Sequence, residues 1–211
     1  MASKVKHNVP YYSQFSDVKR EEFKPNGDGR ACAMTCLKMA LEYIRGEKAL
    51  SVDDLFEEAL IIQQDMLNRG MLTSKAIENG LPHDIIIFVA HNHGVLSYKE
   101  EFKSVSVDIA NNKFSNSRYS ESMLEKSITK LAGVLRDKGI IMVSMPPGFS
   151  TNKSVHTILL IGFEEQDGNL KGFYYHNPDD RTKGVREQFI ALEDFKKTWR
   201  KQAIFFLKMD A

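Results

Sequence analysis

Residues 28–44 read DGRACAMTCLKMALEYI, and the fold that we expect is built outward from them. Their apolar residues recur at intervals of three and four, which predicts a helix with one buried face. A polar loop that contains glycine leads into Cys32, so this thiol lies at or just before the first helical turn. Unpaired backbone N–H groups and the positive end of the helix dipole stabilise a negative charge there. Such a thiol has a lowered pKa and is a better nucleophile.

The composition limits the classes of protein to consider. Hydrophobic residues make up 42% of the 211 residues and charged residues 27%, which allows a packed core. The formal net charge is only +1 and no long basic run occurs, so we expect neither nucleic acid nor a membrane as a partner. The first residues lack the apolar core of a signal peptide, and no apolar cluster is long enough to span a bilayer. We therefore expect a cytoplasmic protein.

Helical patterns dominate the first half of the chain and strand patterns the second half, which predicts an α+β fold. Further helices are expected at 51–62, with a capping box of Ser51 and Asp54, and at 73–80, 122–138 and 192–199. Strands are expected at 85–88, 105–109, 140–144, 155–163, 172–176 and 203–207, with an extended segment at 9–14, a turn at 167–169 and a loop at 111–120. We expect one domain over residues 1–211, with a helical side at about 30–138 and a sheet side at about 139–211.

A cysteine nucleophile needs a base to take its proton and a third group to orient that base. His156 heads one predicted strand, and Asn177 ends the next strand, just before Pro178. Because the two strands form a predicted pair around a turn, the Asn177 side-chain oxygen can accept the imidazole N–H and fix the tautomer. Gln14 can supply a side-chain N–H to an oxyanion hole, beside the backbone N–H of Cys32.

Several short motifs follow one another in an order that resembles a known family. The chain contains a V-P-x-x-x-Q segment (Val9, Pro10, Gln14), a C-x-x-x-x-x-x-M-x-L run (Cys32, Met39, Leu41), an H-x-x-x-x-x-G-F strand (His156, Gly162, Phe163), the pair Asn177-Pro178, and an F-x-x-x-W pattern (Phe195, Trp199). These motifs are similar to those of the papain-like cysteine peptidases, in the branch similar to bacteriocin-leader (double-glycine) peptidases. The ordered matches run from Val9 to Trp199.

This resemblance implies a papain-like fold, in which a helical N-terminal half carries the nucleophile and packs on an antiparallel β-sheet from the C-terminal half. It implies a thiol hydrolase that cleaves a peptide or isopeptide-type amide bond in a peptide or protein substrate. Cys32 would attack, His156 would transfer the proton, Asn177 would orient it, and Gln14 would hold the oxyanion. No cofactor and no metal are implied, and the oligomeric state is left open.

Two alternatives share this sequence pattern. A glutamine deamidase or a transglutaminase-like acyl transferase would use the same triad on a protein substrate. A papain fold could also serve as a catalytically silent binding or nucleotide-handling module. Its main support is that Ala33 and Met34 stand where the family has Gly and Pro after the nucleophile.

Other residues have simpler interpretations. Cys36 is one helical turn from Cys32, where a disulfide would be strained, so we expect two free thiols and a structural role for Cys36. His91 and His93 form an H-x-H pair without a Cys or carboxylate pattern, so we expect no zinc site.

His176 and Asp179 compete with His156 and Asn177 for the roles of base and orienting group. His176 points to the opposite face of its strand from Asn177, which favours a packing role.

Overall fold

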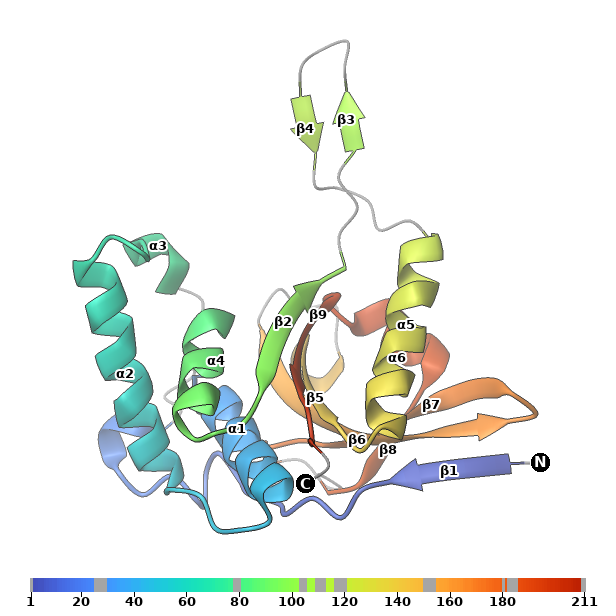
Figure 1. The fold of residues 1–211 in the computed structure, drawn as a ribbon, viewed down its shortest axis with the longest axis horizontal. Coiled ribbons are helices and arrows are strands. Elements are labelled where there is room, and N and C mark those ends of the chain that lie inside the picture. Colours follow the sequence, from blue (N-terminus) through green and yellow to red (C-terminus); the bar gives the residue numbers. More distant parts are fainter. Residues whose placement is uncertain are drawn as a thin grey trace.

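The structure is a computed structural model that describes residues 2–24, 30–77, 81–102, 106–108, 113–115, 121–149, 155–179, 181 and 186–209. Its centre is a seven-stranded antiparallel sheet with helices on both faces (Figure 1). The order along the sheet is β2 (Ser97–Glu101), β9 (Gln202–Phe206), β5 (Ile140–Met145), β6 (His156–Gln166), β7 (Asn169–His176) and β8 (Gln188–Ala191). The remaining strand, β1 (Ala2–Lys6), pairs with the C-terminal half of β6. Two short strands, β3 (Ser106–Asp108) and β4 (Lys113–Ser115), form a separate hairpin.

The two faces of the sheet carry separate hydrophobic cores. On one face pack α1 (Arg30–Arg45) and α4 (His83–Asn92), and α2 (Val52–Asn68) packs against these two helices. Short α3 (Ser74–Ile77) lies between α2 and α4 in the chain. On the other face pack α5 (Glu121–Arg136) and α6 (Leu192–Thr198) (Figure 1). Alternation along β6 divides its side chains between the cores: Leu159 and Ile161 belong to the α1 core, Ile158 and Leu160 to the α5 core.

The predicted α+β class is confirmed, and most predicted elements are present with small shifts at their ends. The Ser51 hydroxyl accepts from the backbone N–H of Asp54, whose carboxylate accepts from the backbone N–H of Ser51, so the capping box exists. Positive φ angles at Asp167 (51°) and Gly168 (77°) form the tight turn between β6 and β7.

One predicted strand is wrong, because residues 85–88 belong to α4. Only part of this apolar run lies on the inner face of the helix: Ile85 and Ile86 are buried, as is Val89 after the run, whereas Phe88 is 45% exposed. An apolar run this short fits a buried strand and a buried helix equally well.

Four strands, β1, β2, β4 and β8, are not predicted by the sequence pattern. The segments ASKVK and SYKEE of β1 and β2 are polar, as is common for strands at or near a sheet edge, so they lack an apolar alternation. Both join the sheet although they lie in the first half of the chain. The strand β4 falls within the loop expected at 111–120. Parts of some predicted elements, at residues 78–80, 105, 109–112 and 116–120, lie outside the described part of the chain. Residues 9–14 contain no regular strand.

Gly162 allows β1 to approach β6. A Cβ atom built on Gly162 would lie 2.1 Å from the backbone oxygen of Val5 and 2.8 Å from Cα of Lys6. The register of β6 against β7 shifts between Leu160 and Gly162, which marks a bulge at this point. A side chain at this position would push β1 away from the sheet, and this explains why the strand that begins with His156 contains a glycine.

Candidate active site

Cys32 is the third residue of α1, so its thiol lies in the first helical turn, and the residue is only 3% exposed. Burial raises the pKa of this thiol. Hydrogen bonds with His156 and Thr157 and the charge of the His156 ring act in the opposite direction and outweigh burial. The pKa of Cys32 is therefore lower than that of an ordinary thiol, which increases the thiolate fraction.

His156 is the first residue of β6 and is buried. Burial lowers the pKa of its ring, but the hydrogen bond and charge of Cys32, the hydrogen bond to Asn177 and the charge of Asp179 raise the pKa above its usual value. The pKa of the thiol and that of the imidazole thus shift toward each other, which increases the share of the thiolate–imidazolium form.

Asn177 directly follows β7, and its side chain faces His156. The β6–β7 register pairs Leu159 with His176, so Asn177 comes to the same face of the sheet as His156. Oδ1 of Asn177 lies 2.7 Å from Nε2 of His156 and accepts the backbone N–H of Asp179 at 3.0 Å. Because this oxygen can only accept, Nε2 carries the proton and Nδ1 remains for the thiol.

Gln14 is 3% exposed and lies beside the chain that follows β7. Its backbone N–H donates to the carbonyl oxygen of Pro178 at 2.9 Å. Among the residues that the structure describes, no group hydrogen-bonds to Oε1 of Gln14. The backbone N–H of Gln14 therefore holds the loop, whereas its side-chain oxygen makes no hydrogen bond that would do so.

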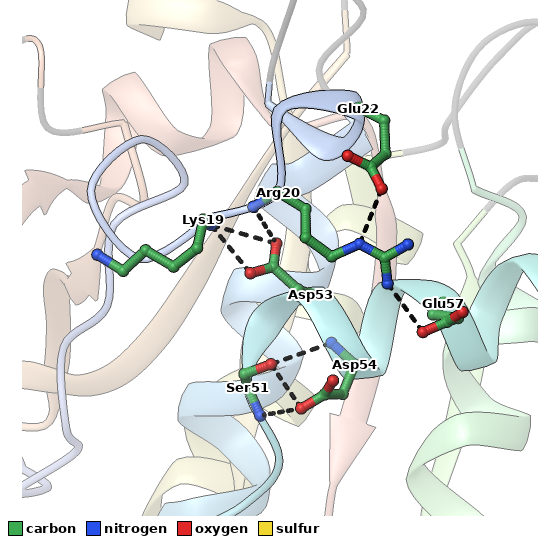
Figure 2. A network of polar contacts seen from close by, with 7 residues as sticks. All are labelled: Lys19, Arg20, Glu22, Ser51, Asp53, Asp54 and Glu57. Atoms are coloured by element: carbon green, nitrogen blue, oxygen red, sulfur yellow. Dashed lines mark hydrogen bonds and ion pairs between the residues drawn. The ribbon is translucent and has the colours of Figure 1, made fainter.

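The loop that precedes α1 is anchored on α2 (Figure 2). The buried carboxylate of Asp53 accepts the backbone N–H of Lys19 at 2.9 Å and that of Arg20 at 3.4 Å. The Arg20 guanidinium donates to Glu22 at 2.9 Å and to Glu57 at 2.8 Å. These contacts hold Lys19 and Arg20, which lie in the chain between the predicted site residues Gln14 and Cys32.

The structure places the competing residues outside the Cys32–His156–Asn177 row. His176 is 2% exposed; its Nε2 lies 3.0 Å from the carbonyl oxygen of Val9, and its Nδ1 accepts the backbone N–H of Glu187 at 3.0 Å. The Asp179 carboxylate binds the Arg181 side chain at 2.8 and 3.0 Å, and this contact lowers the pKa of Asp179.

The remaining candidates have other partners. Cys36 is fully buried and donates to the carbonyl oxygen of Thr157 at 3.6 Å, and burial raises its pKa. His91 lies 2.9 Å from the carbonyl oxygen of Ser97, and His93 lies 2.8 Å from the Glu58 carboxylate.

In the described part of the chain, no three or more His, Cys, Asp or Glu side chains come together as a metal site. Within those same residues, no helix has both the length and the apolar character that crossing a bilayer requires.

Two residues near the row were missed by the sequence argument. Thr157 hydrogen-bonds with Cys32 through its side chain and its backbone. The Tyr11 hydroxyl donates to the carbonyl oxygen of Asn177 at 3.0 Å. Their only signals in the sequence are that Thr157 follows His156 and that Tyr11 lies in the V-P-x-x-x-Q segment.

Residues 6–203 match the model of the family described as "Peptidase_C39 like family". A search among curated proteins found no match. Solved structures share the fold at low sequence identity, and three of them illustrate the likeness.

A Bacillus anthracis protein described as a C39-like peptidase is 16% identical with a TM-score of 0.61, and the match covers 99% of this chain and 100% of that one. The peptidase domain of Streptococcus ComA, a bifunctional ABC transporter of a quorum-sensing pathway, is 14% identical with a TM-score of 0.50 over 85% and 93% of the two chains. A double-glycine-motif protease from an AMS/PCAT transporter, in complex with the leader peptide, is 13% identical with a TM-score of 0.51 over 97% of each chain. The predicted resemblance and the papain-like fold class are thereby confirmed.

Proposed function

We propose, on the premise that this chain belongs to the Peptidase_C39 like family, that it is a cysteine peptidase that hydrolyses a peptide or isopeptide bond. One observation carries the proposal: the Cys32 thiol hydrogen-bonds with His156, and His156 in turn lies 2.7 Å from the Asn177 side-chain oxygen. A nucleophile, a base and an orienting acceptor thus come together from distant parts of the chain, in the order that the chemistry requires.

In the proposed mechanism, the proton of Cys32 resides on Nδ1 of His156, and the thiolate attacks the carbonyl carbon of the scissile bond. His156 then gives this proton to the leaving amine as the C–N bond breaks and a thioester forms. Neutral His156 next takes a proton from water, which attacks the thioester and releases the acid. Throughout, Asn177 accepts the Nε2–H and keeps the ring in one orientation.

The negative oxygen of each tetrahedral intermediate needs preorganised donors. The backbone N–H of Cys32 is in the first turn of α1, where no intrahelical carbonyl is available to it. We assign the second donor to the side-chain amide of Gln14. The bond from its backbone N–H to Pro178 holds Gln14 in the loop, and its side-chain oxygen has no hydrogen-bond partner among the described residues.

The two departures from the family pattern are compatible with an active peptidase. Met34 is fully buried in the core beneath α1, so its bulk does not enter the site. Ala33 adds only one methyl group relative to Gly. A peptide substrate is supported by the double-glycine-motif protease of similar fold, whose structure contains a leader peptide.

Replacement of the nucleophile tests the proposal. We expect iodoacetamide to label wild-type protein at Cys32, and we expect wild type to cleave members of a peptide library that includes double-glycine sites, both read by mass spectrometry. Cys32→Ala should lose labelling and cleavage while it keeps its thermal transition. Cys36→Ala is the matched control and should behave as wild type, because Cys36 is fully buried and its pKa is raised.

Cleavage by Cys32→Ala at the wild-type rate would reject the proposal, as would a Cys32 thiol that is not labelled. If wild type changes the mass of glutamine residues by deamidation and cleaves no peptide, the reaction is acyl transfer to water at a side chain instead.

A further inference from the structure

We propose that His176 is a positioning residue that sets the place of Gln14 through the backbone of residues 9–14. This inference rests on the function proposed above and adds to it a residue that touches neither the nucleophile nor the base. It arises from the hydrogen bonds that join the N-terminal segment 9–14 to the end of β7.

Both nitrogens of the His176 ring are engaged. Nδ1 accepts the backbone N–H of Glu187 at 3.0 Å, so this nitrogen carries no proton. The proton is therefore on Nε2, which donates to the carbonyl oxygen of Val9 at 3.0 Å. The ring also packs edge-on against Tyr11, with centroids 5.4 Å apart, and is 2% exposed. One tautomer and one orientation of His176 are thus fixed.

Three consecutive residues at the end of β7 hold the N-terminal segment. His176 binds Val9, the carbonyl of Asn177 accepts the Tyr11 hydroxyl at 3.0 Å, and the carbonyl of Pro178 accepts the Gln14 N–H at 2.9 Å. The segment has no regular strand, so these contacts define its register against β7. On its other side, the Tyr12 hydroxyl donates to Glu42 of α1 at 2.7 Å.

The bond to Val9 is made by the side chain of His176, which points away from the Cys32–His156–Asn177 row. The other two bonds are accepted by backbone carbonyls of Asn177 and Pro178. Loss of this bond releases the start of the segment while the Cys32–His156–Asn177 contacts are left in place. Gln14 would then move relative to the thiol, and the oxyanion would lose a donor. The thiolate itself would be unchanged, since its pKa depends on His156 and Thr157.

Two variants separate this role from a general packing role. His176→Gln puts an amide N–H near the position of Nε2 and can keep the bond to Val9. His176→Asn puts its amide near the position of Nδ1 and loses that bond. Both are measured in the full chain beside Gln14→Ala, with hydrolysis of the best-cleaved library peptide and the rate of iodoacetamide alkylation of Cys32 as readouts. Alkylation needs the thiolate but no oxyanion hole.

We expect His176→Asn to lower kcat by about tenfold or more, up to the loss of about 10²–10³-fold that follows removal of an oxyanion donor, with the alkylation rate unchanged. His176→Gln should retain most of the activity. The double variant His176→Asn/Gln14→Ala should be no slower than Gln14→Ala alone, because both changes remove the same contact. Additive losses, an unchanged kcat in His176→Asn, or an equal fall in alkylation and hydrolysis would overturn the inference.

A readout without catalysis keeps this test apart from the test of the proposed function. Hydrogen exchange of the Gln14 amide, which is bonded to Pro178, should become faster in His176→Asn than in His176→Gln. If wild type cleaves no peptide, the proposed function fails, while the exchange result still decides whether His176 fixes the segment. Equal exchange in the two variants would overturn the positioning role even in an active enzyme.

Discussion

Nε2 of His156 lies 2.7 Å from Oδ1 of Asn177, and the same oxygen accepts the backbone N–H of Asp179. The second contact prevents the amide from turning its nitrogen toward the ring, since an N–H would then face the N–H of Asp179. The backbone after β7 thereby determines which nitrogen of His156 faces Cys32.

Asn177→Ala should remove this orientation and lower kcat by about 10²-fold, near the lower end of the range for general acid–base catalysis. Asn177→Asp keeps an acceptor for both N–H groups and should retain more activity. Steady-state kinetics on a cleaved peptide, with a thermal melt as the control for folding, measures both variants. Equal activity of Asn177→Ala and wild type would contradict the assigned role.

The pH dependence of alkylation should report the Cys32–His156 pair. The pKa of Cys32 is lowered and that of His156 is raised. The thiolate therefore forms at a lower pH than in an ordinary cysteine, and the imidazolium persists to a higher pH than in an ordinary histidine. Iodoacetamide rates measured from acid to alkaline pH should rise early in wild type. In His156→Gln they should rise at higher pH, because a hydrogen bond and a positive charge are lost. A common midpoint in both proteins would refute the pairing.

Gly162→Ala should destabilise the protein by about 1–3 kcal/mol, the usual cost of an overpacked site. The added methyl group would meet the backbone oxygen of Val5, so β1 must move. Gly133→Ala is the matched control, because nothing lies within 4 Å of the Cβ position in the middle of α5. That change should instead stabilise by about 0.5–1 kcal/mol. Urea unfolding of both variants gives the comparison, and equal stabilities would show that β1 does not depend on the glycine.

Asp53→Ala should cost about 1–3 kcal/mol, because two backbone N–H groups, of Lys19 and Arg20, lose a charged acceptor. Asp54→Ala in the same helical turn removes the carboxylate that accepts from the backbone N–H and the hydroxyl of exposed Ser51, and should cost about 1 kcal/mol or less. Thermal unfolding ranks the two. A larger loss for Asp54→Ala would show that the loop before α1 does not depend on Asp53.

The amount of structure that the sequence predicts depends on how local each signal is. The helix after Cys32 and the hairpin of β6 and β7 are encoded by period and by turn residues, so their positions follow from the pattern. Residues 85–88 show the opposite case, since four apolar residues fit a helix and a strand alike. β1 and β2 are strands only because distant partners, β6 and β9, offer them hydrogen bonds.

The same distinction holds for the site. Residue type and order predict Cys32, His156, Asn177 and Gln14 as site residues. Thr157 and Tyr11 are not predicted as site residues. Their contacts depend on strand register and on a backbone carbonyl oxygen, which residue types do not reveal. The sequence shows that His176 precedes Asn177 and favours a packing role for it. The structure adds that both ring nitrogens are hydrogen-bonded to backbone groups.

The pairing of β1 with β6 has a consequence for synthesis on the ribosome. Val5 is opposite Phe163 and Gln14 is bonded to Pro178. Val5 and Gln14 can therefore make these contacts only after residues much later in the chain have been translated. The sulfur emerges long before the imidazole and the amide exist, and a nascent chain that stops short of Pro178 cannot assemble them. Such non-local closure slows folding, so a candidate site that is built from both ends of the described chain is completed late in folding.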